Sequence, residues 1–207
     1  KDAAIAATVF KAGKKEGSHC KVCGKVLRKQ ITVAKLKPTI SLTASSLKMK
    51  AGQSTTAFKA AGLAKGDYVT KVTSGNTGIV KVSSVTKKGT FRLTAGKKAG
   101  STTVKVILAS KKSASFKVTV QRGAVKTSKI TVSTKSVTLK KGTTYRKLAS
   151  SVKVTPVTSQ EKVTYTSSNK KIATVTSGGV IKGLKKGTAT ITIRSGSKRT
   201  TCKVTVK

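Results

Sequence analysis

The stretch TYTSSNKKIATVTSGGVIKGLKKGTATITI, from Thr164 to Ile193, alternates apolar and polar residues with a period of two. This period is typical of half-buried antiparallel strands, because successive side chains of a strand point to opposite faces. Glycines interrupt the stretch, and Gly178-Gly179 predicts a hairpin turn. Lys, Thr and Ser fill most polar positions and no acid is present, so we expect short strands with a basic outer face.

The same order of segments occurs twice in the chain. The matching pairs are ISLTASSLKMKAGQS (40–54) with ITVSTKSVTLKKGTT (130–144), VTKVTSGNTGIVKVSS (69–84) with VTYTSSNKKIATVTS (163–177), and KKAGSTTVKVILASKKSASFKVTV (97–120) with LKKGTATITIRSGSKRTTCKVTV (184–206). The offset is 90 residues at Ile40 and Ile130. We therefore expect two tandem domains, 38–121 and 126–207, joined by RGAVKT at 122–127.

The strand and turn pattern predicts an all-β fold. Short strands with frequent turn signals are typical of a sandwich or barrel, and the richness in Val, Ile, Leu and Thr suits strands. Residues 1–37 lie outside the repeat and predict a small β-hairpin element, with strands around 20–27 and 30–36. No apolar run is long enough to predict a transmembrane helix. The opening KDAAIAAT lacks an initiator Met and is expected to belong to a longer or processed protein.

Residues 130–207 resemble a bacterial immunoglobulin-like domain of group 2, the class found in intimin- and invasin-type adhesins. The segments that carry the resemblance are VTLKKGTTY (137–145), YTSSNKKIATVTSGGVIKGLKKGTATITI (165–193) and CKVTVK (202–207). Tyr165 stands where the family often has Trp. Residues 40–121 resemble the same family with a degenerate central segment, SGNTGIVKV. The resemblance implies two tandem immunoglobulin-like β-sandwiches that act as extracellular spacers or adhesion modules and are rarely enzymes.

The N-terminal residues are similar to a short Cys-containing repeat of Firmicutes surface proteins. EGSHCKVCG, at 16–24, carries this similarity, and Val9 stands where the repeat has an upstream Cys. Together the two resemblances imply a protein that is extracellular or attached to the wall or surface of a bacterium.

The charge of the chain is extreme. There are 45 Lys and Arg against four acids, Asp2, Glu16, Asp67 and Glu161, and the formal net charge is +41. Such a charge opposes compaction and favours contact with polyanions. Only six of the basic residues are Arg, so diffuse attraction by hydrated ammonium groups is expected rather than bidentate recognition.

Pairs of lysines recur at turns of both repeats. Those we expect to contact a polyanion are Lys87, Lys88, Lys97, Lys98, Lys140, Lys141, Lys170, Lys171, Lys185 and Lys186. A solvated surface that happens to use Lys is the simpler explanation, but solvated surfaces usually mix both signs. Anionic cell-wall polymers, acidic glycans, extracellular DNA and an acidic protein are the candidate partners. Few aromatic residues are available to stack on bases, so a specific nucleic-acid target is not expected.

Three cysteines, Cys20, Cys23 and Cys202, leave the sulfur chemistry open. A C-x-x-C turn can place two thiolates on one metal, but at most three ligands can be counted near His19-Cys20-Lys21-Val22-Cys23. A local disulfide or two reduced thiols in a hairpin are simpler, and the βαβ context of a redox motif is absent. Cys202 aligns with a core position and is expected to act as a small buried hydrophobe. We expect no bound metal and no cofactor.

Catalysis has little support in the sequence. The only histidine is His19, and neither a Ser-His-acid arrangement nor a phosphate-binding loop is recognisable. A Lys–Asn crosslink would need a buried Lys, an Asn and an acid together, whereas Asn76 and Asn169 sit at turn-like positions. The chain is therefore not expected to be an enzyme.

The expected function is a structural and adhesive module of the bacterial surface that holds anionic polymers by distributed lysine charge. A first alternative is a subunit of an extracellular fibre or coat, assembled by strand addition to exposed sheet edges or through an acidic partner. A second is the spacer region of a glycan-degrading enzyme whose catalytic domain lies elsewhere. A homo-oligomer is compatible with the first alternative.

Overall fold

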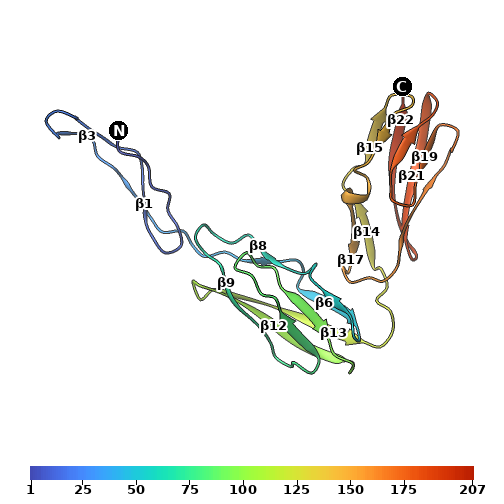
Figure 1. Cartoon of the computed structure of the whole chain (residues 1–207), viewed down its shortest axis with the longest axis horizontal. Helices are drawn as coiled ribbons and strands as arrows, with labels where there is room; N and C mark the ends of the chain where they lie inside the picture. Colours follow the sequence, from blue (N-terminus) through green and yellow to red (C-terminus); the bar gives the residue numbers. More distant parts are fainter. The chain divides into compact units, whose positions relative to one another are not determined.

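The computed structural model describes all residues, 1–207, and its regular secondary structure is almost entirely β-strand (Figure 1). The chain divides into two compact units, one of residues 1–47 and 51–120 and one of residues 48–50 and 121–207. The one helical segment is a 3-10 turn, η1, at Ala149–Ser151. No helix is both long and apolar enough to cross a membrane.

The N-terminal element consists of two short strand pairs. Its strands are β1 (Gly13–Lys14), β2 (Ser18–His19), β3 (Val26–Arg28) and β4 (Thr32–Val33), with β1 paired to β4 and β2 to β3. The strand expected at 20–27 was wrong. The Cys20 N–H donates to Lys25 O and the Gly24 N–H to Cys20 O, so this segment closes a turn instead. Gly24 has a φ of 72°, which suits a glycine.

Val9 helps to tie the N-terminal element to the strands that follow. Val9 is buried, and its N–H donates to the carbonyl oxygen of Lys65 at 3.0 Å. Val9 therefore has a packing role here.

The first repeat folds into a sandwich of nine strands, called sandwich 1. They are β5 (Ser41–Leu42), β6 (Ser46–Lys50), β7 (Ser54–Thr55), β8 (Ala60–Ala61), β9 (Val69–Ser74), β10 (Val80–Ser83), β11 (Arg92–Ala95), β12 (Gly100–Leu108) and β13 (Ser113–Gln121). One sheet has the order β6-β13-β12-β9 and the other β10-β11-β7, with β5 paired to β8.

The second repeat, sandwich 2, has the same topology strand for strand. Its strands are β14 (Lys129–Val132), β15 (Ser136–Leu139), β16 (Thr144–Tyr145), β17 (Val152–Thr155), β18 (Val163–Ser167), β19 (Ala173–Val175), β20 (Ile181–Gly183), β21 (Gly187–Ser195) and β22 (Lys198–Val206). The sheets are β15-β22-β21-β18 and β16-β20-β19, with β14 paired to β17. The expected all-β fold of tandem sandwiches is confirmed, as is the hairpin turn at Gly178-Gly179 between β19 and β20.

Period-two alternation builds the core of each sandwich. In β21 and β22 the inward residues Ile191, Ile193, Cys202 and Val204 are fully buried, and their neighbours in the chain face outward. Removing these apolar side chains from water is the main force that holds the two sheets together. The outward positions are free of that constraint, which leaves them available for Thr, Lys and Arg.

Candidate anion-binding surface

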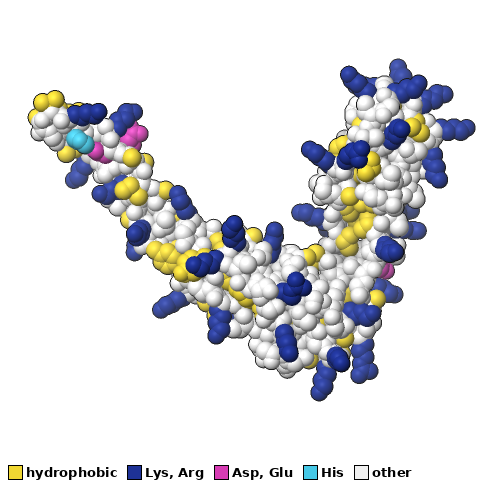
Figure 2. Space-filling view, in the orientation of Figure 1, with side chains coloured by type: hydrophobic (Ala, Val, Ile, Leu, Met, Phe, Trp, Pro, Cys, Tyr) yellow, Lys and Arg dark blue, Asp and Glu magenta, His cyan; other side chains and the backbone are white.

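All basic side chains of the protein lie on its surface. Every one of the 45 Lys and Arg residues is exposed, and Figure 2 shows them spread over both sandwiches and the N-terminal element. Two salt bridges, Lys1 to Glu16 at 3.5 Å and His19 to Asp2 at 2.7 Å, lie in the N-terminal element. Most of the positive charge of the sandwiches therefore faces solvent ions or a ligand.

The one acid of each sandwich holds a turn in place instead of balancing lysines. The carboxylate of Asp67 accepts a hydrogen bond from the Ser110 hydroxyl at 2.6 Å and one from the Tyr68 N–H at 3.0 Å. Glu161 Oε2 accepts the Thr127 N–H at 2.7 Å, and its carboxylate lies directly against Gly196. Both carboxylates thus serve the fold.

Three of the five expected lysine pairs meet at one end of sandwich 2. The Gly142 N–H donates to Gly183 O at 2.8 Å, and the Leu184 N–H to Ile172 O at 2.7 Å, so the β15–β16, β18–β19 and β20–β21 turns are neighbours. We call this region the lysine end; it comprises Lys140, Lys141, Lys170, Lys171, Lys185, Lys186 and Lys207. Figure 2 shows dark blue side chains crowding the end of sandwich 2 where β22 terminates.

The lysine pairs of sandwich 1 do not meet. Lys87 and Lys88 lie in the β10–β11 connection, where Lys87 Nζ is 5.2 Å from the centre of the Tyr68 ring. Lys97 and Lys98 lie in the β11–β12 turn, at the opposite end of β11. The ten expected contact residues are therefore split between separate turns, and only those of sandwich 2 form one cluster.

A shallow cavity borders the lysine end. It has a volume of about 310 Å³ and lies between the edge strands β18 and β19, lined by Tyr165, Thr166, Ser167, Lys170, Thr174 and Val175. Burial raises the pKa of the Tyr165 phenol further above physiological pH, where the group is a neutral hydrogen-bonding hydroxyl. A ring, several hydroxyls and one ammonium group side by side can bind a sugar that carries an acidic substituent.

An arginine pair on the outer face of sandwich 2 escaped the sequence reasoning. Arg194 on β21 lies directly opposite Arg199 on β22, and Thr164 of β18 continues the same row. Like charges directly opposite each other destabilise a sheet unless an anion lies between them. The signal was present in the sequence as RSGSKR, two arginines flanking a tight turn, but only the strand register shows that they face each other.

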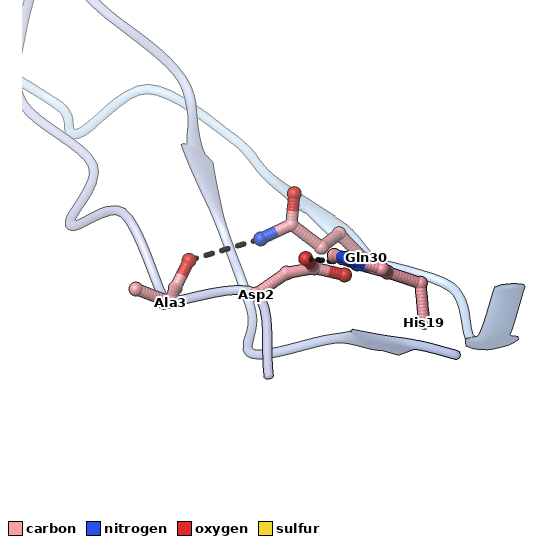
Figure 3. A network of polar contacts seen from close by, with 4 residues as sticks. All are labelled: Asp2, Ala3, His19 and Gln30. Atoms are coloured by element: carbon pink, nitrogen blue, oxygen red, sulfur yellow. Dashed lines mark hydrogen bonds and ion pairs between the residues drawn. The ribbon is translucent and has the colours of Figure 1, made fainter. Parts of the chain in front are cut away.

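Two polar contacts fix the start of the chain within the N-terminal element. His19 Nδ1 donates to Asp2 Oδ1 at 2.7 Å, and Gln30 Nε2 donates to the carbonyl oxygen of Ala3 at 2.9 Å (Figure 3). The two contacts fasten the first residues of the chain to β2 and to the β3–β4 connection. Cys20 and Cys23 are free thiols in the turn, and no group of three or more His, Cys, Asp or Glu residues is arranged to hold a metal.

The two asparagines considered for a crosslink both cap the same kind of turn. Asn76 Oδ1 accepts the Gly78 N–H at 2.9 Å, and Asn169 Oδ1 accepts the Lys171 N–H at 3.0 Å. Both side chains are exposed at a turn, so they lack the buried setting that a Lys–Asn crosslink would need.

Solved structures of surface proteins are similar to this chain. Domains 5-6 of the S-layer protein SbsC share 21% identity over 81% of this chain and 96% of that one, with a TM-score of 0.41. SbsC domains 4 and 5 share 23% identity over 65% of this chain and 74% of that one, with a TM-score of 0.35. Protocadherin Gamma C5 EC1-3 shares 11% identity over 95% of this chain and 76% of that one, with a TM-score of 0.37.

No protein of curated function matches the sequence. A family model does match the C-terminal part of the chain, over residues 126–206. That range contains all nine strands of sandwich 2 and the turns of the lysine end. Residues 126–206 are thus identified as a bacterial Ig-like domain (group 2).

Proposed function

We propose that this protein is a structural and adhesive module of the bacterial surface that holds an anionic polymer through its lysine-coated sandwiches, most strongly at the lysine end. The bacterial Ig-like match supports a surface or extracellular module without catalytic activity. The observation that carries the proposal is the convergence of three lysine pairs on one end of sandwich 2, with no acid among them. Multivalent contact of this kind releases many counterions at once.

The cavity next to the lysine end narrows the class of polymer. Lys170 belongs to both the lysine end and the wall of this cavity, next to Tyr165 and Thr166. A chain that alternates sugar units with acidic groups would use the lysines for charge and the cavity for a sugar. We therefore favour an acidic glycan or a sugar-containing cell-wall polymer over nucleic acid.

A subunit of a fibre or coat is the second candidate, and an edge strand favours it. β18 pairs only with β21, so its other side offers unpaired backbone groups to an incoming strand. Sedimentation at high protein concentration and physiological salt tests this function. A monomer under those conditions contradicts it.

A spacer region of a glycan-degrading enzyme is the third candidate. The lysine end would then hold the acidic substrate near a catalytic domain encoded elsewhere in the same reading frame. Reading the complete gene decides this candidate, since a catalytic module beside these domains supports it and its absence removes it.

The polymer proposal is tested by binding across a salt series with two charge-matched variants. The cluster variant replaces Lys140, Lys141, Lys170, Lys171, Lys185 and Lys186 with Gln. The control variant replaces six exposed lysines of sandwich 1 with Gln, namely Lys59, Lys65, Lys71, Lys81, Lys105 and Lys117. The ligands are teichoic acid, a sulfated mucin glycan, heparin and DNA.

We expect the cluster variant to lose more affinity than the control variant at equal net charge. The slope of log K against log salt should fall by about 4 in the cluster variant, if six lysines each contribute about 0.7. Equal losses in both variants would show a diffuse coat without a preferred end. If the unmodified protein bound none of the four polymers at physiological salt, the proposed function would be contradicted.

A further inference from the structure

The β2–β3 hairpin carries large apolar side chains that the rest of the chain leaves uncovered. Val22, in the turn, is 96% exposed. Val26 and Leu27 on β3 are 62% and 68% exposed, and Ile31 after β3 is 60% exposed. Apolar groups gathered on a surface in this way mark a contact with a partner. We call residues 20–31 the apolar tip, and Figure 2 shows hydrophobic side chains in yellow at the far end of the N-terminal element.

The charge of the apolar tip has a single sign. Its exposed basic residues alternate with the apolar ones and are Lys21, Lys25, Arg28 and Lys29. No acid occurs between Glu16 and Asp67, and Glu16 already pairs with Lys1 at 3.5 Å. The carboxylate of Asp2 is held by His19 at 2.7 Å. The apolar tip therefore presents cationic and apolar groups together, which is complementary to a surface that is anionic outside and apolar beneath.

The turn pairs polar backbone groups within itself and points its apolar side chain outward. The Cys20 N–H donates to Lys25 O at 2.8 Å, and the Gly24 N–H donates to Cys20 O at 3.0 Å. Backbone groups that are already paired lose less when they leave water for a less polar medium. Because Val22 is almost fully exposed, it protrudes from the turn instead of lining a groove.

We propose that the apolar tip binds the surface of an anionic lipid bilayer. Val22 and Leu27 enter the boundary between headgroups and acyl chains, where interfacial segments bury their apolar side by about 5–10 Å. The long side chains of Lys21 and Lys25 keep their ammonium groups at the level of the lipid phosphates. A bilayer fits a protruding tip better than a folded protein does, because lipids move around an inserted side chain and need no preformed groove.

Depth of entry separates this contact from general attraction. Each Lys or Arg close to an anionic bilayer strengthens binding by about fivefold, and the sandwiches also carry many lysines. Adsorption of this protein to vesicles is therefore expected from charge alone. Only the apolar tip places a side chain below the headgroups, so the decisive experiment reports the depth of one residue. This contact does not depend on the lysine end.

A single Trp provides the depth reporter, because the chain has none of its own. The reporter variant is Val22→Trp. The control is Val85→Trp in the β10–β11 connection, where Val85 is 39% exposed and Lys87 and Lys88 follow it. Both are mixed with vesicles of phosphatidylcholine and phosphatidylglycerol in equal parts, with and without bromine on the acyl chains, and separately with soluble teichoic acid. We expect a blue shift and bromine quenching for Val22→Trp on vesicles only, and neither for the control.

A pair of charge-matched variants measures the apolar contribution without an added ring. The tip variant carries Val22→Ser and Leu27→Ser, and its control carries Val85→Ser and Val157→Ser, two other exposed valines. Both are sedimented with the same vesicles at about 0.5 M salt, where exposed charges are strongly screened. The tip variant should lose about tenfold in vesicle affinity, because it no longer buries its methyl groups, and the control should bind as the unmodified protein does.

Every outcome bears on the proposal. Blue shift and quenching confined to Val22→Trp, together with the weaker binding of the tip variant, support it. A reporter that stays in water on the vesicles, equal shifts in both reporters, or equal affinities of the two Ser variants overturn it. A blue shift with teichoic acid alone also overturns it, in favour of a polymer contact. Circular dichroism checks folding, and teichoic acid binding by the tip variant is measured separately, so failure of this contact is distinguishable from failure of the proposed function.

Discussion

Sandwich 1 and sandwich 2 share every strand pairing and yet fill their cores with different chemistry. Phe58 and Phe116 stack in sandwich 1, with ring centres 4.0 Å apart, and Phe91 lies 6.3 Å from Phe116. In sandwich 2 the positions of Phe58 and Phe116 hold Leu148 and Cys202, both fully buried. The rings of sandwich 2, Tyr145 and Tyr165, pack against the side of its core and are only partly buried.

The third phenylalanine shows how the difference arose. Phe91 belongs to the connection between β10 and β11, residues 84–91, whereas the corresponding connection of sandwich 2 spans only residues 176–180. The longer connection folds over the core and inserts a ring. The comparison teaches that strand alternation fixes the topology of this domain, while a longer connection can add a buried side chain to the core.

The largest expected effect is the loss of a ring from the core of sandwich 1. Phe116→Ala should destabilise sandwich 1 by about 3–5 kcal/mol, because it removes a stacked ring and leaves a cavity. Cys202→Ala at the corresponding position should destabilise sandwich 2 by about 1 kcal/mol, since it removes a single sulfur atom. Differential scanning calorimetry of the whole chain measures both, and equal shifts would contradict the difference between the cores.

Ala substitutions at two turn glycines should also destabilise sandwich 1 more than sandwich 2, by a smaller margin. Gly89 has a φ of 92°, and a Cβ there would lie 2.5 Å from the carbonyl oxygen of Ala60. Gly179 has a φ of 75°, and its Cβ would lie 3.1 Å from Tyr165 Cζ. Both Ala variants should lower the free energy of unfolding by about 1–2 kcal/mol, because Ala disfavours the left-handed backbone. Gly89→Ala should lower it further, because its Cβ also clashes with the main chain. Urea denaturation that ranks Gly179→Ala as the more harmful would refute this.

Alkaline pH should weaken sandwich 2 and leave sandwich 1 unchanged. Burial raises the pKa of the Cys202 thiol, with a smaller opposing effect of Lys135, so the folded state keeps its proton to higher pH than the unfolded chain. The thiol therefore contributes its full stabilisation at pH values below the pKa that it has in the unfolded chain. This stabilisation is lost as the pH rises through the pKa of the folded state. The urea concentration at which sandwich 2 is half unfolded should fall as the pH is raised from about 8 to 9.5, a range below the pKa of lysine. The same fall in Cys202→Ala would show that another group is responsible.

The smallest expected effect concerns the outer face of sandwich 2. Arg199→Thr should stabilise sandwich 2 by about 0.2–1 kcal/mol at low salt, because it removes the charge opposite Arg194. Lys203→Thr is the control, since Lys203 pairs with Thr190 and Ser136. Added salt should reduce the gain. Thermal unfolding in a salt series tests this, and an equal gain in both variants would mean that the arginine pairing is irrelevant.

Most of the fold was predictable from the sequence because both sandwiches obey the period-two pattern. Alternation in β21 and β22 separates the buried Ile191 and Val204 from exposed neighbours, and the glycines mark the turns. The N-terminal element was the exception. Its strands are two or three residues long, too short for a period, so the turn at Cys20–Gly24 was mistaken for part of a strand.

The candidate site was predictable as residues but not as an arrangement. The lysine pairs are visible at the turns, yet their convergence depends on contacts such as Gly142 with Gly183, residues far apart in the chain. The facing of Arg194 and Arg199 depends on hairpin register in the same way. Sequence shows which side chains are at turns, and only the sheet order shows which turns share an end.

The most direct test of the account is a lysine acylation footprint read by mass spectrometry, with and without a bound acidic cell-wall polymer. The account predicts that Lys140, Lys141, Lys170, Lys171, Lys185 and Lys186 lose reactivity most. Exposed lysines of sandwich 1, such as Lys71, Lys105 and Lys117, should stay reactive. Uniform protection of all lysines, or protection confined to sandwich 1, would contradict a binding surface at the lysine end.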